Sequence, residues 1–163
     1  MNILLKILLI GIGSTATMDI YAFILRQFGI NGLDYRFLGR WIGYLFKGKF
    51  FHHKIVDSPA IKSEVIIGQL AHYAIGIVFA FLLVLFFGKK WLSVPTLLPA
   101  LIIGWLTLLA PFFIMQPAFG FGIGGSNLPN PIKARLMSFL IHSIYGLGLF
   151  LSAFMISKFK WGN

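Results

Sequence analysis

Long apolar stretches separated by shorter polar segments form the main pattern along the chain. Four of these stretches lie near residues 3–25, 65–87, 94–115 and 136–157. Each is close to the roughly 20 residues that a helix needs to cross a bilayer. The pattern therefore predicts an all-α polytopic membrane protein, with four transmembrane helices in one bundle and a single membrane domain over residues 1–163.

The first apolar stretch could instead be a secretory signal, because Lys6 precedes an apolar run. No clear small-x-small cleavage site follows, and Asp19 lies within the run. We therefore expect the first span to be retained.

The segment between the first two spans, residues 26–64, is too apolar for a solvated linker. Asp34 can act as the N-cap of a helix there. Apolar residues follow it at helical spacing, namely Leu38, Trp41, Ile42 and Leu45. We predict a helix lying in the membrane interface, with its aromatic rings at the level of the headgroups. A simple anchor is favoured over a lid that gates a substrate.

Two Xaa-Pro pairs resemble helix starts, because each places a capping side chain before a proline that suits the first helical position. Ser58-Pro59 predicts that the second long helix begins before its membrane-embedded part, and Asn130-Pro131 predicts the start of the fourth. His52-His53, flanked by lysines, is interpreted as a wet basic surface rather than a metal site.

Composition supports the membrane class and restricts the chemistry. Hydrophobic residues make up 58% of the chain and charged residues 11%, with a formal net charge of +10. Because Lys and Arg occur in loops and at helix ends, we expect anionic lipid headgroups as partners and no nucleic acid. The absence of cysteine excludes disulfides, thiolate-bound iron–sulfur clusters and cysteine nucleophiles.

Basic residues are distributed unequally between the two faces of the membrane. The first and third loops together carry nine of the 14 Lys and Arg residues: Arg26, Arg36, Arg40, Lys47, Lys49, Lys54, Lys62, Lys133 and Arg135. Because cytoplasmic loops are enriched in Lys and Arg, we predict that these two loops face the cytoplasm and that both termini lie outside.

The glycines Gly120, Gly122 and Gly125 have the spacing of a dinucleotide-binding fingerprint. That fingerprint requires a preceding strand and a following helix in a βαβ unit, whereas here an apolar span precedes it. We predict instead a tight, partly buried connection, with a re-entrant form as one alternative, in which Asn127 and Asn130 cap a helix or bind a ligand.

Three ionisable side chains lie within the predicted spans at one depth. Asp19, His72 and His142 are each six or seven residues from a span end on the same face, roughly 9 to 11 Å inside the helix. Gln116 lies at the entrance. Each of the three lies on or near small residues spaced by four, which mark close helix approach: Gly11, Thr15, Gly68, Gly76, Ala80, Ser138 and Gly146. The pattern predicts an inward-facing polar site.

Several interpretations of this site stay open. Asp19 can pair with Arg26 or Arg40, and each histidine can form a structural interhelical hydrogen bond. The three side chains together can also bind or transport a small polar or lipid-like ligand, which we rank first because no catalytic motif is visible. Alternatively, Asp19, His72 and His142 bind a divalent metal, or the two histidines hold a haem b, in a membrane enzyme. A structural subunit of a membrane complex, or a homo-oligomer, is the remaining class.

Several segments together resemble a bacterial inner-membrane family catalogued as a domain of unknown function, number 2938. They are ILLIGIGSTATMD, GRWIGYLFKGKF, LAHYAIGI, PTLLPALIIGW, LAPFFIMQPAFGFGI, PNPIKARL and HSIYGLGLFL. The resemblance covers almost the whole chain. It implies four membrane helices and a location in the bacterial inner membrane, and it implies no established activity.

Overall fold

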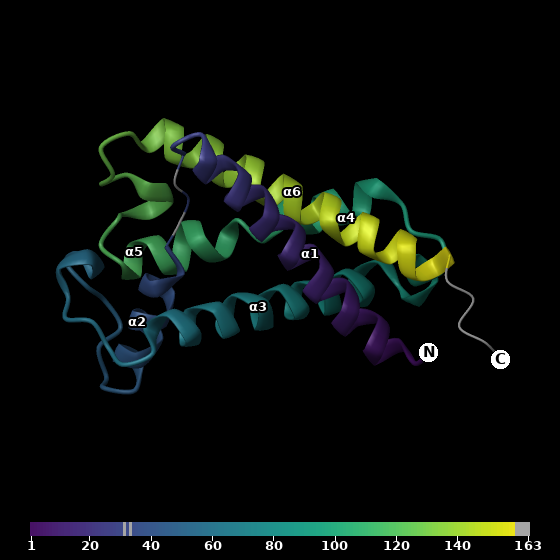
Figure 1. The fold of residues 1–163 in the computed structure, drawn as a ribbon, viewed down its shortest axis with the longest axis horizontal. Coiled ribbons are helices and arrows are strands. Elements are labelled where there is room, and N and C mark those ends of the chain that lie inside the picture. The colour runs from purple at the N-terminus through teal and green to yellow at the C-terminus, as the bar shows by residue number, and fades with distance from the viewer. Residues whose placement is uncertain (31, 33, 159–163) are drawn as a thin grey trace. The chain divides into compact units, whose positions relative to one another are not determined.

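The structure is a computed structural model that describes residues 1–30, 32 and 34–158. Its described part is helical and contains no strand, as predicted (Figure 1). The α-helices are α1 (Ile3–Gln27), α2 (Tyr35–Leu45), α3 (Glu64–Phe87), α4 (Leu97–Leu106), α5 (Gln116–Ala118) and α6 (Pro131–Lys158). Short turns η1 (Ile55–Asp57), η2 (Lys89–Leu92), η3 (Pro111–Met115) and η4 (Ile123–Gly125) connect them.

Four helical segments are long and apolar enough to cross a membrane, which confirms the predicted spans. They are Ile3–Gln27, Glu64–Phe87, Leu97–Ala118 and Pro131–Lys158. The third is not a regular α-helix, because Pro111 opens a π-helical turn between α4 and α5. Proline lacks the amide hydrogen that an α-helical bond at this position would use, so the helical hydrogen-bond pattern changes there.

The chain divides into two compact units. The first contains Met1–Asn31, Tyr73–Thr107 and Leu140–Asn163, and the second contains Gly32–His72 and Leu108–Phe139. Each unit has its own cluster of buried apolar side chains.

In the first unit, α1, α4 and the adjoining parts of α3 and α6 pack closely at glycines. A Cβ atom on Gly11 would lie 2.6 Å from the Cα of Ile77, and one on Gly104 would lie 2.9 Å from the Cα of Gly146. Only glycine permits helix axes to approach this closely. The predicted small-residue positions Gly11 and Gly146 therefore do face neighbouring helices.

In the second unit, the predicted amphipathic helix is α2. The carboxylate of Asp34 accepts a hydrogen bond from the Arg36 amide at 2.9 Å, which confirms the predicted N-cap. Leu38 is buried with Ile55 and Phe119 in the core of this unit. Part of the apolar face that was predicted to lie in the interface is therefore protein core.

One of the two predicted helix starts is wrong. Asn130 accepts from the Lys133 amide at 3.1 Å and α6 begins at Pro131, as predicted. Ser58-Pro59 does not start α3, which begins at Glu64. The Ser58 hydroxyl lies instead 2.8 Å from Nδ1 of His52, so this side chain organises the preceding loop.

Candidate functional site

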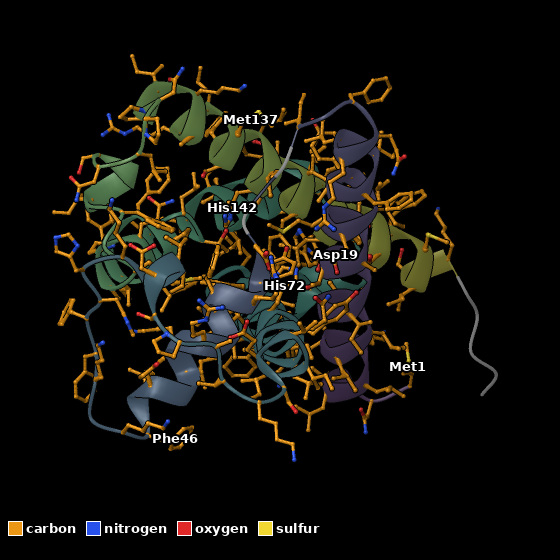
Figure 2. All side chains as sticks on the ribbon, turned by 60° about the vertical axis from the view of Figure 1, so that its left-hand side comes forward. Met1, Asp19, Phe46, His72, Met137 and His142 are labelled. Atoms are coloured by element: carbon orange, nitrogen blue, oxygen red, sulfur yellow. The ribbon has the colours of Figure 1, made fainter. Side chains whose placement is uncertain are left out.

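Asp19 lies on α1 in the first unit (Figure 2). It has a partner that the sequence did not identify. The hydroxyl of Tyr73, on α3, forms a hydrogen bond with the Asp19 carboxylate. A hydrogen-bonded carboxylate is far cheaper to keep inside a membrane helix than an isolated one. Tyr73 directly follows His72 in the sequence. These two adjacent polar side chains within an apolar span were the signal that could have pointed to Tyr73 as a partner.

His142, on α6 of the same unit, contacts α4. Its Nδ1 atom forms a hydrogen bond with the hydroxyl of Thr107, which also donates to the carbonyl of Gly104. A hydroxyl has one hydrogen, so a donation to Gly104 makes Nδ1 the donor to Thr107. Nε2 of a neutral His142 then carries the lone pair, which is the form that can bind a metal or accept a proton.

Other polar side chains inside the first unit serve the packing. The Tyr145 hydroxyl donates to the carbonyl of Gly76 at 2.7 Å, which joins α6 to α3. Ser14 and Thr15 are fully buried and donate to carbonyls one turn earlier in α1. Because these groups are satisfied within the protein, they are structural.

His72 belongs to the second unit and stacks on an aromatic ring. Its ring centroid lies 4.1 Å from that of Tyr35, with an interplanar angle of 23°. Tyr35 is the first residue of α2, and its carbonyl lies against Gly68 of α3. A Cβ on Gly68 would lie 1.9 Å from the carbonyl oxygen of Tyr35. The close approach at Gly68 thus brings α2 to the helix that carries His72.

Gln116 has an unusual environment among the predicted site residues. Its Oε1 atom is buried and has no hydrogen-bond partner in the part of the chain that the structure describes. A Cβ on Gly125 would lie 3.5 Å from this oxygen, so the glycine-rich turn runs beside the amide. A buried acceptor without a partner costs about 1 to 3 kcal/mol, which makes this oxygen a candidate for contact with a ligand.

The glycine-rich segment forms a tight connection, as predicted. Gly120 and Gly122 have φ angles of +82° and +74°, and a Cβ on Gly120 would lie 1.9 Å from the carbonyl oxygen of His53. Glycine is required there because L side chains fit neither the angle nor the space. Asn127 donates to the carbonyl of Gly120 at 3.3 Å, while Asn130 caps α6. These contacts give both asparagines a structural role.

His52 corrects the sequence interpretation of a wet basic surface. It is 4% exposed, whereas His53 is exposed as expected. Nδ1 contacts Ser58, and Nε2 is buried without a partner among the described residues. Burial lowers the pKa of His52, and the positive charges of Lys49 and Arg40 lower it further. His52 is therefore held as a neutral imidazole at neutral pH.

The strongest electrostatic contact of the second unit was also missed. Arg40 forms a buried, bidentate ion pair with Glu64, rather than the pair with Asp19 that the sequence analysis considered. Glu64 is the only acidic residue at the start of the second span, which was the signal in the sequence. Because both side chains are fully engaged, the pair acts as a structural clamp.

Metal-binding geometry is not evident. Within residues 1–30, 32 and 34–158, no group of three or more His, Cys, Asp or Glu side chains could hold a metal ion. Asp19 and His142 belong to the first unit, and His72 belongs to the second. The three-ligand interpretation of these residues therefore gains no support from the structure.

Comparison with known proteins gives a family and nothing more specific. The model of a family described as protein of unknown function (DUF2938) matches residues 8–156. No curated protein and no solved structure matches the chain. The functional argument therefore depends on the residues themselves.

Proposed function

We propose that this chain, which belongs to the DUF2938 family of proteins of unknown function, binds a small polar or lipid-like ligand at Gln116. The observation that carries the proposal is the buried Oε1 atom without a partner. This atom lies in the third candidate span, Leu97–Ala118. A polar atom surrounded by protein and hydrocarbon is stabilised when a ligand supplies the missing hydrogen bond.

The chemistry of the amide oxygen defines the class of ligand. An amide oxygen only accepts, so the ligand must present a hydroxyl, ammonium or amide hydrogen. Lipid headgroups with an ethanolamine ammonium or glycerol hydroxyls meet this requirement, as do small polar solutes. Asp19 and His142 in the first unit, and His72 in the second, are separate candidates for ligand contact within their own units, because titratable groups within membrane spans commonly mark substrate or proton paths.

Native mass spectrometry of the purified protein tests this proposal. We expect a bound small molecule or lipid on the wild type that is lost from Gln116→Met, which keeps the side-chain length and removes the amide. The matched control is Gln27→Met, at an exposed position at the end of α1. The ligand-free Gln116→Met protein should be as stable as the wild type or more stable, because an unsatisfied buried acceptor has been removed.

Equal retention of the molecule by the wild type and both variants would contradict the proposal. Two other classes give different results in the same preparation. A metal- or haem-dependent enzyme should contain stoichiometric metal or show a Soret absorption band. A structural subunit should co-purify with a second protein at a fixed ratio, whatever residue stands at position 116.

A further inference from the structure

Residues 46–54, which we call the Phe46–Lys54 segment, expose three phenylalanines outside the candidate spans. Phe46 is 88% exposed, Phe50 58% and Phe51 71%. Exposed apolar side chains are expected where a helix faces lipid, but this segment lies between the spans Ile3–Gln27 and Glu64–Phe87. A cluster of exposed aromatic side chains in a connecting segment indicates an interaction surface.

The segment is held in a defined conformation by its own unit. The indole of Trp41 donates to the Phe50 carbonyl at 2.8 Å, and the His52 amide donates to the Ala118 carbonyl at 2.8 Å. Gly48 adopts a φ of +72° in the turn that follows α2. The backbone that carries the phenylalanines is therefore already ordered. Binding then costs less conformational entropy than it would for a disordered segment.

Positive charge accompanies the phenylalanines. The ammonium groups of Lys47 and Lys49 lie 5.4 and 5.3 Å from the centroid of the Tyr44 ring, within the range of cation–π attraction. Lys54 ends the segment, and no acidic residue occurs between Asp34 and Asp57. Lysines beside an anionic lipid surface are attracted to its phosphates, so this basic segment is complementary in charge to such a surface.

The segment is also anchored close to a membrane span. Arg40 of α2 contacts Glu64, the first residue of α3. Phe46, the C-cap of α2, is six residues after Arg40. At about 1.5 Å of rise per residue, the segment begins roughly 9 Å from the residue that touches the span. A bilayer surface offers apolar groups for the phenylalanines and, at an adjacent depth, anionic groups for the lysines. Water solvates the lysines but not the phenylalanines.

We infer that the Phe46–Lys54 segment docks on the anionic leaflet beside the spans. Phe46, Phe50 and Phe51 enter the boundary between headgroups and acyl chains, and the three lysines contact lipid phosphates. This surface is independent of the ligand proposed at Gln116.

Because the chain has no cysteine, one introduced cysteine can report on this docking. We propose Phe51→Cys with an environment-sensitive fluorophore, in nanodiscs of phosphatidylcholine alone or mixed with phosphatidylglycerol. Asp57→Cys, an exposed acidic position in the same loop, is the matched control. The charge variant combines Lys47→Gln, Lys49→Gln and Lys54→Gln in the Phe51→Cys protein.

We expect a blue shift of the emission at position 51 that is larger with phosphatidylglycerol, and water-like emission at position 57. The charge variant should lose the difference between the two lipid compositions. Water-like emission at position 51 in both nanodiscs would overturn the inference and would favour an acidic protein as the occupant. An equal blue shift in both lipids would overturn the role of anionic headgroups.

Discussion

Arg40 and Glu64 form an ion pair in which Nε and Nη2 of the arginine each lie 2.8 Å from one carboxylate oxygen. Both side chains are 9% exposed. Nη1 of Arg40 additionally donates to the carbonyls of Ile55 and Ser58 at 3.0 and 2.8 Å. One guanidinium group thus joins α2, the η1 turn and the first turn of α3, because its five N–H groups can bond in several directions at once.

Breaking this clamp should be costly. We expect Arg40→Met and Glu64→Gln each to lower the free energy of unfolding by about 3 to 5 kcal/mol, because one buried partner is left uncompensated. Arg40→Met should be the more severe change, since it also removes donors from the carbonyls of Ile55 and Ser58. Unfolding in mixed micelles, followed by circular dichroism, measures the effect.

The exposed ion pair of Arg36 and Asp34 supplies the control. The Arg36 side chain is 55% exposed and its ion pair is screened by solvent, so Arg36→Met should lower the free energy of unfolding far less than Arg40→Met does. Similar losses for Arg36→Met and Arg40→Met would show that the buried pair is not the clamp described above.

His52 should make stability depend on pH. Its pKa is lowered in the folded protein from the ordinary value of 6.5, first by burial and then by Lys49 and Arg40. Below pH 6.5 the unfolded chain binds a proton that the folded protein does not yet bind, so stability falls as the pH is lowered through this range. The fall ends once the pH is below the folded-state pKa.

We expect His52→Asn, whose amide can keep the contact with Ser58, to flatten this pH dependence between pH 7 and 5. His53→Asn, at an exposed position, should keep the slope of the wild type. Thermal unfolding midpoints at several pH values measure both slopes. The assignment is wrong if the slope follows His53 or is unchanged by either substitution.

Hydropathy predicted the spans well because the length of each apolar run is fixed by bilayer thickness. The local capping of α2 by Asp34 and of α6 by Asn130 was also predictable, since each cap depends on residues only two or three positions apart. The start of α3 was not. Ser58-Pro59 has the composition of a cap, but the Ser58 side chain bonds to His52, and that contact depends on the fold of the whole loop.

The environment of the candidate site was predictable only in part. Depth arguments identified Asp19 and His142 as polar positions, but could not name Tyr73 and Thr107 as their partners. Such partners depend on helix rotation, which periodicity in strongly apolar spans does not fix because every face is apolar. The burial of His52 was hidden for a different reason, since its sequence neighbours are lysines and only the approach of the loop near Ala118 encloses it.

Orientation in the membrane stays a prediction from the basic residues of the first and third loops. We expect reporter fusions after Gly88 and after the last residue of the chain to give periplasmic signals in a bacterial host. The physical basis is the retention of Lys and Arg on the cytoplasmic side during insertion. Cytoplasmic signals from both fusions would reverse the topology, and a fusion within the Phe46–Lys54 segment should then report from the periplasm.

The contact between Gly76 and Thr15 provides a steric test of how α1 and α3 pack. A Cβ on Gly76 would lie 2.0 Å from Oγ1 of Thr15, which is fully buried. We expect Gly76→Ala to destabilise the protein by about 1 to 3 kcal/mol, because the helices must separate and weaken the bond from Tyr145 to the Gly76 carbonyl. Ala74→Val, which adds volume at an exposed position of α3, should change stability by no more than about 0.5 kcal/mol.

Thr15→Ala should rescue the overpacked protein. This change removes Oγ1, and the next atom toward the new Cβ is the Thr15 Cβ at 3.4 Å, an ordinary van der Waals contact. Because residues in contact are not additive, Gly76→Ala with Thr15→Ala should be more stable than Gly76→Ala alone. The Thr15 hydroxyl donates to the carbonyl of Gly11 one turn earlier in its own helix, so its loss alone should cost little. Additive losses in the double variant would mean that the methyl group added at position 76 does not meet the Thr15 hydroxyl. The helices α1 and α3 would then pack in another register.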